Sequence, residues 1–214
     1  MTTTFLLVRH GQSIANIEKR FAGHWDAPLS QLGQQQAFAT AAYLTAQYNI
    51  DAVYASDLSR AYETGKAIAD KCHLPVIQNA AFREINAGDW EGLRFDDLQI
   101  QFPDSYTTWM HNIGEAVCDN GESVAHLQER FATALKKIAD ENDGATVAVA
   151  THATPIRSLQ CLCLEQPLSY MKLIPWVPNA SVTVVTYTNG TFSLVLAGYA
   201  DHLGNQISHL PANV

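Results

Sequence analysis

Short apolar runs alternate with longer segments of helical periodicity along this chain. Residues 5–8, 51–55 and 146–150 form mostly apolar runs, which are typical of strands buried on both faces of a sheet. Residues 75–77 are a candidate for a further short strand. The spacing between these runs leaves room for a helix after each strand, as in a parallel sheet.

Several segments carry apolar residues at helical spacing. Ser30 is placed to cap one helix, and Pro155 falls in the first turn of another, where its missing N–H does no harm. The middle of the chain, residues 82–121, has weak periodicity and predicts a loop followed by one or two short helices. The segments with clear helical periodicity are residues 30–48, 58–72, 123–142 and 154–164.

The end of the chain contains a hairpin signal, because Asn189-Gly190 separates two strand-like runs at residues 181–187 and 192–197. Strands that alternate with helices and end in a hairpin predict an α/β fold. We expect a three-layer sandwich with a mainly parallel central sheet, an antiparallel edge hairpin and helices on both faces. No repeat or linker divides the chain, so we expect a single domain over residues 1–214, with a lid-like insertion at about 93–120.

Composition and charge exclude several classes of function. With 47% hydrophobic and 16% charged residues, the chain is typical of a globular protein. A net charge of −8 argues against a nucleic-acid-binding or basic membrane-surface protein. We find no targeting or membrane-spanning pattern and expect a cytoplasmic location. The four cysteines lack zinc-site spacing, and Cys161 and Cys163 are predicted to be packing residues in a reducing compartment.

Candidate chemistry follows three of the predicted strands. Arg9 and His10 come directly after the first strand, Arg60 follows the second, and His152 follows the fourth in chain order. Ligands of open α/β sheets bind beyond the carboxyl ends of the strands, so we expect these four side chains to converge. Together they would repel one another in a core, whereas a phosphoryl group would satisfy them, because arginine presents a fork of donors to phosphate oxygens.

The residues around this predicted cluster resemble a known family. Leu7-Val8-Arg9-His10-Gly11-Gln12-Ser13 resembles the Arg-His-Gly signature of the histidine phosphatase superfamily, which includes cofactor-dependent phosphoglycerate mutases. The resemblance covers nearly the whole chain, with the blocks in the family's order. The further blocks are Asn16 with Arg20-Phe21-Ala22-Gly23 through Ser30, then Ser56–Ala61, then Arg83-Glu84 with Gly88–Gly92, then Gly121-Glu122-Ser123, and finally Val149–His152 with Ile156-Arg157.

The resemblance implies a role for each residue of the cluster. His10 is the implied nucleophile, which attacks phosphorus through a neutral ring nitrogen and forms a phosphohistidine. Its other ring nitrogen is expected to donate to a backbone carbonyl. Arg9, Arg60 and His152 are implied to hold the transferring oxygens, and Glu84 to protonate the leaving oxygen and then activate water.

Three further residues are implied to bind phosphate or substrate, and two positions depart from the family pattern. Asn16 and the backbone N–H of Ala153 are expected to add donors, and Gly23 belongs to the same binding set. Ala153 stands where the family usually has glycine, which would reshape the pocket if a positive φ were needed there. His24 stands where an aromatic residue is common.

The activity implied is that of a metal-independent phosphomonoesterase, with no cofactor, acting on a small phosphorylated metabolite. Residues 85–92 resemble the phosphatase version of the family rather than the mutase version, which has Glu-Arg-His-Tyr. A cofactor-dependent phosphoglycerate mutase remains an alternative, and a non-catalytic phosphate-binding protein is a third. Glu84 has a competing interpretation as the partner of Arg83 in a solvated salt bridge.

The predicted lid carries several aromatic residues and few cations, which favours a substrate with one phosphate and some apolar body. The remaining histidines show no ligand spacing and are predicted to lie at the surface. The lid residues in question are Phe95, Phe102, Tyr106 and Trp109, with Arg83 and Arg94 nearby. The histidines are His24, His73, His111, His126, His202 and His209.

Overall fold

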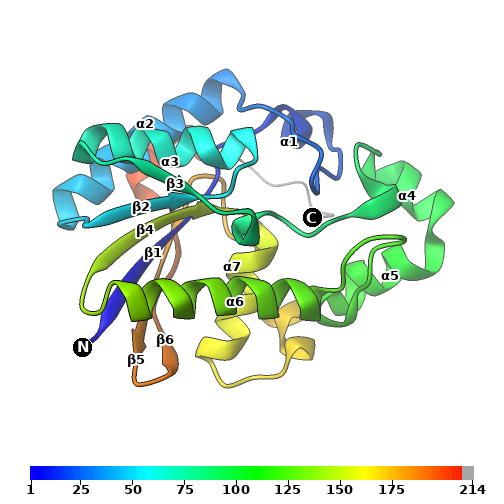
Figure 1. The fold of residues 1–214 in the computed structure, drawn as a ribbon. Helices are drawn as coiled ribbons and strands as arrows, with labels where there is room; N and C mark the ends of the chain where they lie inside the picture. Colours follow the sequence, from blue (N-terminus) through cyan, green and yellow to red (C-terminus); the bar gives the residue numbers. More distant parts are fainter. Residues whose placement is uncertain (209–214) are drawn as a thin grey trace.

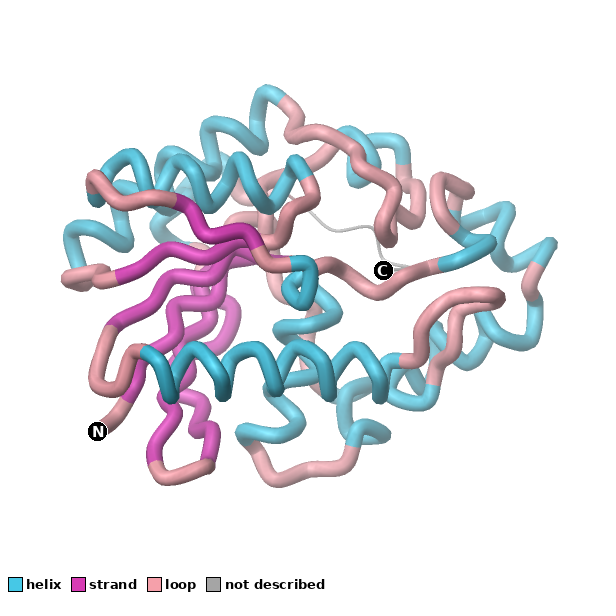
Figure 2. The backbone as a smooth tube through the Cα atoms, in the orientation of Figure 1, coloured by secondary structure: helices cyan, strands magenta, loops and turns pink. Residues whose placement is uncertain are grey.

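The computed structural model describes residues 1–208, and within them one six-stranded sheet has the order β3-β2-β4-β1-β5-β6. Figure 1 and Figure 2 show this sheet between two layers of helices, so the predicted α/β sandwich is confirmed. The strands are β1 (Thr3–Arg9), β2 (Ala52–Ala55), β3 (Val76–Gln78), β4 (Thr146–Thr151), β5 (Val182–Thr188) and β6 (Thr191–Tyr199). His209, predicted to lie at the surface, is outside the described residues.

The directions of the strands match the expected mainly parallel sheet. β1 pairs in parallel with β4, and β2 pairs in parallel with both β4 and β3. β5 runs antiparallel to β1 and forms an antiparallel hairpin with β6. Asn189 and Gly190 have φ values of 50° and 88°, the positive φ pair that a tight hairpin turn of this hand requires.

The long helices lie close to their predicted bounds. The Oγ of Ser30 caps its helix by accepting from the Gly33 N–H, and the Oγ of Ser123 caps another by accepting from His126. A single-turn helix at residues 14–18 was not predicted, because five residues are too few to show periodicity. The helices are α1 (Ile14–Glu18), α2 (Gln31–Gln47), α3 (Ser59–Cys72), α4 (Phe95–Gln101), α5 (Pro103–Asn112), α6 (Val124–Glu141) and α7 (Ala153–Cys163).

Successive side chains of β1 point to opposite faces of the sheet and pack into the apolar core on each face. Phe5 and Leu7 face one side, where they pack with residues of α6 and α7, whereas Leu6 and Val8 pack with residues of α2 and α3. Figure 1 accordingly shows α2 and α3 over one face of the sheet and α6 and α7 over the other. Both faces of the parallel strands are therefore buried, which leaves their carboxyl ends as the place for a site.

A third apolar cluster lies beyond the sheet and forms around Trp90, which is fully buried. Helices α4 and α5 contribute to it, and the two short helices and the 3₁₀ turn Ile113–Glu115 agree with the prediction for the middle of the chain. Cys161 is buried and Cys163 half-buried, both as free thiols, so their predicted packing role is confirmed. No helix within residues 1–208 is both long and apolar enough to cross a bilayer.

Candidate active site

The parallel pairing of β1 with β4 brings the two histidines of the site together. Arg9 lies opposite Thr151 in the ladder, so His10 and His152 leave the sheet side by side, and the His10 N–H donates to Thr151 O at 2.9 Å. Their ring centroids are 5.1 Å apart. Strand β2, on the other side of β4, leads to α3, which carries Arg60 in its first turn. The expected convergence of the strand ends is present in the fold.

One pocket at this edge of the sheet gathers nearly all the predicted site residues. Its walls include Arg9, His10, Asn16, Gly23, Arg60, Glu84 and Ala153. His152 does not line the pocket; it is fully buried and packs edge-on against His10. Within residues 1–208, no group of three or more His, Cys, Asp or Glu side chains is arranged to bind a metal.

His10 is held as a neutral ring with one nitrogen free. Its Nδ1 lies 2.7 Å from Gly11 O and donates to it, so the proton is on Nδ1 and the lone pair is on Nε2. The expected backbone carbonyl is therefore that of Gly11. Burial, together with the charges of Arg60 and Arg9, holds the pKa of His10 well below its ordinary value. A neutral imidazole with a free Nε2 is the state required of a nucleophile.

The two arginines are fixed by backbone carbonyls but keep unsatisfied donors. Arg9 donates through Nη1 to Val177 O at 2.6 Å, and Arg60 donates through Nη1 and Nη2 to Trp25 O and Gly23 O at 3.0 and 2.7 Å. Burial lowers the pKa of each arginine to about 10, so both are cationic at neutral pH.

Three buried polar atoms of this cluster have no hydrogen-bond partner among the described residues: the Nε of Arg9, the Nε of Arg60 and the Nδ1 of His152. The other ring nitrogen of His152 lies 3.0 Å from Ser56 Oγ. Buried polar groups are nearly always paired in folded proteins, because an unpaired group loses its hydration without compensation. An anion in the pocket would supply acceptors where the arginine donors lack them.

Close backbone approaches fix the loops around the pocket. A Cβ on Gly11 would lie 2.3 Å from Gly33 O, so only glycine allows this contact. Gly23 has a φ of +51°, and a Cβ there would lie 2.6 Å from the Cβ of Ala87. Thr64 Oγ1 accepts from the Gly11 N–H and donates to Arg60 O, which links the turn after β1 to α3.

Asn16 and Ala153 each present a donor side to the pocket. Asn16 Oδ1 accepts from Ser13 N at 3.0 Å and from Asn179 Nδ2 at 3.2 Å, which leaves its amide Nδ2 as the group available to a ligand. Ala153 is the first residue of α7, so its N–H has no acceptor within the helix. Its φ is not positive. The departure from glycine at this position therefore causes no backbone strain.

Glu84 reaches the pocket by its side chain and is not the partner of Arg83. Its Oε1 accepts from the Ile85 N–H at 2.9 Å, and its Oε2 accepts from the Thr154 N–H at 3.3 Å. Arg83 instead pairs with both oxygens of Asp57, with an Nε–Oδ1 distance of 2.7 Å, and this contact lowers the pKa of Asp57. The salt-bridge interpretation of Glu84 with Arg83 is thus wrong.

Two of the surface predictions for histidines are also wrong. His24 is half-buried, and its Nε2 donates to Glu84 O at 3.0 Å. His202 is half-buried as well and stacks on Tyr43. Spacing along the chain could not reveal either contact, because both partners are distant in sequence. His73, His111 and His126 are exposed, as predicted.

The aromatic wall of the pocket differs in part from the expected one. Phe95 and Trp109 line the pocket, whereas Phe102 and Tyr106 pack on Trp90. Neither Arg83 nor Arg94 reaches the pocket. Residues that line it without being among the predicted site residues include Arg20, Phe21 and Trp176. Arg20 and Phe21 stood in a recognised block, but Trp176 lies in an irregular segment with no sequence signal.

Comparisons with known proteins agree with this geometry. The sequence family model of the histidine phosphatase superfamily (branch 1) matches residues 5–199 of this chain. The phosphoglycerate mutase-like protein 4 of Arabidopsis thaliana is 34% identical over 201 residues, covering 92% of this chain and 86% of that protein. The phosphoserine phosphatase 1 of Hydrogenobacter thermophilus is 29% identical over 202 residues, 93% of each chain. The solved structure of Bacillus stearothermophilus YhfR superposes with a TM-score of 0.89 at 30% identity, covering 94% of this chain and 99% of that one.

Proposed function

The chain belongs to the histidine phosphatase superfamily (branch 1) and is a phosphatase, and on that premise we propose that it hydrolyses a small phosphomonoester through a phosphohistidine on His10. The observation that carries the proposal is the pair of buried, unpartnered Nε atoms of Arg9 and Arg60 beside a neutral His10, all three residues lining one pocket. These groups match the oxygens of a phosphoryl group and leave the His10 Nε2 free to attack it.

The proposed reaction has two steps. In the first, His10 Nε2 forms a bond to phosphorus as the bond to the leaving oxygen breaks, and Glu84 gives its proton to that oxygen. In the second, the Glu84 carboxylate takes a proton from water, whose oxygen displaces the Nε2 and releases inorganic phosphate. The cationic Arg9 and Arg60, with the donors of Asn16 and Ala153, stabilise the charge on the equatorial oxygens, and His152 packs behind the His10 ring.

The substrate class is proposed from the pocket wall. Phe21, Phe95, Trp109 and Trp176 line the pocket beyond the phosphate-binding cluster, and Arg20 adds one cation. We propose that residues 93–120 act as a lid within a single domain over 1–214, and that the substrate has one phosphate and a compact, partly apolar body. The relative named phosphoserine phosphatase supports a small monoester of this kind.

The test is detection of the intermediate during turnover. The protein is mixed with 4-nitrophenyl phosphate, quenched in alkali, which preserves phosphohistidine, and assayed for protein-bound phosphate. We expect release of 4-nitrophenol together with an acid-labile phosphate on the native protein and none on a His10→Ala variant. Release of 4-nitrophenol without any bound phosphate would overturn the phosphohistidine route, and no release at all would favour a non-catalytic phosphate-binding protein.

Mutase activity is the second candidate, favoured by the relative named phosphoglycerate mutase-like protein. It is measured as isomerisation of 3-phosphoglycerate in the presence of 2,3-bisphosphoglycerate, against hydrolysis of the same compounds. We expect hydrolysis to exceed isomerisation. The opposite ratio would replace the phosphatase assignment by that of a mutase.

A further inference from the structure

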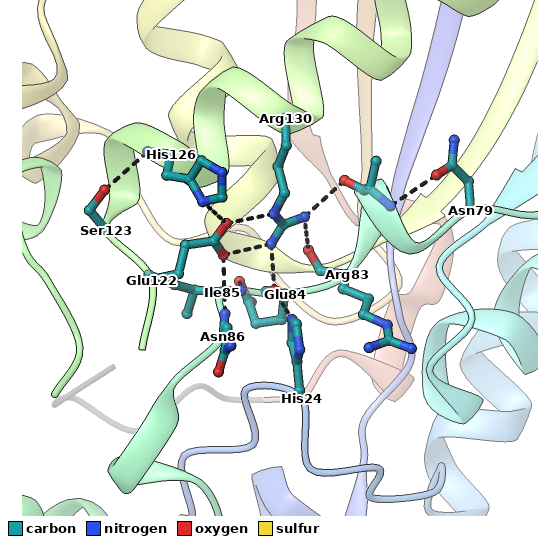
Figure 3. Close-up of polar contacts among 11 residues, drawn as sticks. His24, Asn79, Arg83, Glu84, Ile85, Asn86, Glu122, Ser123, His126 and Arg130 are labelled. Carbon is teal, nitrogen blue, oxygen red and sulfur yellow. Dashed lines mark hydrogen bonds and ion pairs between the residues drawn. The ribbon is translucent and has the colours of Figure 1, made fainter. Parts of the chain in front are cut away.

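Arg130, in the middle of α6, holds the segment that carries Glu84. Its guanidinium donates to three backbone carbonyls of that segment, those of Ala81 at 2.9 Å, Arg83 at 3.0 Å and Glu84 at 2.7 Å. Figure 3 shows the guanidinium lying against this stretch of backbone. A single side chain thus fixes the backbone on the N-terminal side of Glu84 and at Glu84 itself.

Glu122 fixes Arg130 in turn. Its two oxygens accept from the Nε and Nη2 of Arg130 at 2.7 and 2.9 Å, and one of them also accepts from the Asn86 N–H at 3.1 Å. Glu122 is 8% exposed, and although burial acts in the opposite direction, the bonds from Arg130 lower its pKa. The pair therefore holds the Glu84 segment on both sides, through Arg83 and Glu84 before it and Asn86 after it.

A second donor reaches the same carbonyl from the loop that follows α1. His24 Nε2 donates to Glu84 O at 3.0 Å, so this oxygen accepts from two side chains. His24 follows Gly23, whose carbonyl accepts from Arg60. The segment that carries Glu84 is thereby connected to the loop that orients one of the phosphate-binding arginines, as Figure 3 shows for the His24–Glu84–Arg130 contacts.

A contribution to the stability of the fold does not by itself explain the Arg130–Glu122 pair. Buried ion pairs contribute little net stability, because desolvation offsets much of the Coulomb attraction. Residues 83–86 form no helix or strand; besides these side-chain contacts, they are ordered by the buried Ile85 side chain, the Arg83–Asp57 ion pair and the bond from the Glu122 N–H to Asn86 O. A general acid, by contrast, must lie within hydrogen-bond reach of the proton acceptor, and displacement by about 1 Å costs on the order of a hundredfold in rate.

We propose that Arg130, oriented by Glu122, is a positioning residue for Glu84 and sets the efficiency of proton transfer to the leaving oxygen. The inference rests on the proposed function, in which Glu84 is the acid. It concerns geometry: the planar guanidinium bridges three carbonyls and a carboxylate, which a lysine ammonium cannot reproduce.

The test compares leaving groups. Arg130→Met and Arg130→Lys are assayed with 4-nitrophenyl phosphate, whose leaving group needs little protonation, and with 2-glycerol phosphate, whose alkoxide needs it. We expect kcat/KM, which reports the step that releases the leaving group, to fall about tenfold more for the alkyl ester than for the aryl ester, given that general acid catalysis contributes about 10²–10⁴-fold. Inhibition by inorganic phosphate should stay unchanged in both variants, because the arginines that bind phosphate are untouched.

Two further variants separate positioning from stability. Arg130→Met leaves Glu122 buried without its partner, so the double variant Glu122→Leu with Arg130→Met removes both charges and should show the same leaving-group bias. Lys137→Met, on the same helix with an exposed ion pair to Glu141, is the matched control and should behave as the native protein. Equal losses on the two esters, or recovery of the alkyl rate in Arg130→Lys, would overturn the positioning role.

Glu84→Gln distinguishes failure of this inference from failure of the proposed function. If Glu84→Gln shows no bias against the alkyl ester, Glu84 is not the acid, and both the proposed acid role of Glu84 and the positioning role of Arg130 are overturned. If Glu84→Gln shows the bias and Arg130→Met does not, only the role of Arg130 is overturned. We expect the variant that combines Glu84→Gln with Arg130→Met to show no more bias than Glu84→Gln alone, because both changes impair the same proton transfer to the leaving oxygen.

Discussion

The rings of His10 and His152 lie edge to face, with centroids 5.1 Å apart and an interplanar angle of 62°. Burial, with the charge of Arg60 next, holds the pKa of each histidine well below its ordinary value. Two buried imidazoles can share this space because the lowered pKa of each keeps its ring neutral. The positive field that meets an arriving phosphate therefore comes from Arg9 and Arg60.

This relationship predicts that the protein loses stability in mild acid. In the unfolded chain the two histidines bind protons below a pKa of about 6.5, whereas in the fold they stay neutral, so stability falls as pH drops below that value. The slope is about 1.4 kcal/mol per pH unit for each histidine. We expect the free energy of unfolding to be roughly 3 kcal/mol lower at pH 5.5 than at pH 7.5. Urea unfolding at the two pH values measures it.

His152→Gln is the control for that measurement. It removes one of the two groups, so the difference between the two pH values should shrink by about 1.4 kcal/mol. His202, whose pKa is also lowered by burial, contributes equally to the native protein and the variant and cancels from the comparison. A native protein with flat stability between these pH values would contradict the neutral state assigned to the two rings.

Replacement of the nucleophile should remove turnover. We expect His10→Ala to lower kcat on 4-nitrophenyl phosphate by on the order of a thousandfold or more, because no other group can form the bond to phosphorus. His73→Asn is the matched control: this exposed histidine has a φ of 57°, a conformation that asparagine tolerates. Steady-state rates at enzyme concentrations high enough to detect the residual activity decide the question, and a loss below tenfold would point to another nucleophile.

Inorganic phosphate should stabilise the protein through the unpartnered donors. Ligand that binds only the folded state at a hundred times its Kd adds about 2.7 kcal/mol of stability. We expect a rise of Tm with phosphate in the native protein and little or none in Arg60→Met, which lacks one cation and its buried Nε. Sodium chloride at equal ionic strength is the control. Equal shifts with chloride and phosphate, or a full phosphate shift in Arg60→Met, would argue against a phosphate site at these residues.

The aromatic residues of the pocket wall should affect binding of the substrate body and leave binding of the phosphate group unchanged. Phe95 lines the pocket, and Phe102 packs on Trp90 away from it. We expect Phe95→Leu to raise KM for monoesters with aromatic bodies roughly fivefold, corresponding to an aromatic contact of about 1 kcal/mol, and to leave the inhibition constant of inorganic phosphate unchanged. Phe102→Leu serves as the comparison. The same rise in both variants would assign the effect to disturbed packing rather than to a substrate contact.

The positions of the strands and the convergence of Arg9, His10, Arg60 and His152 could be predicted from sequence because each rests on a local signal. An apolar run that ends in polar residues marks a strand end, and parallel strands bring their ends to one edge. The cap at Ser30 and the Asn189-Gly190 turn are equally local.

Other parts of the site depend on contacts between distant segments and carry no local signal. Trp176 reaches the pocket from an irregular segment after α7, where it also stacks under the Arg157 guanidinium at 4.0 Å. Arg130 occurs on an ordinary amphipathic helix, and nothing in the spacing of its neighbours shows that it contacts Glu84. Phe102 and Phe95 look equivalent in sequence, and only packing around Trp90 separates their roles.

The ladder between β1 and β4 also sets when the protein can become active during folding. The parallel pairing of β1 with β4 brings His10 and His152 together, and β4 is made from the last third of the chain. Contacts between such distant segments form late, because a long loop must first close. Helices such as α2 and α3 can form before that closure, whereas the pocket cannot. Recovered phosphatase activity should therefore follow helix formation in a refolding experiment and report completion of the central sheet.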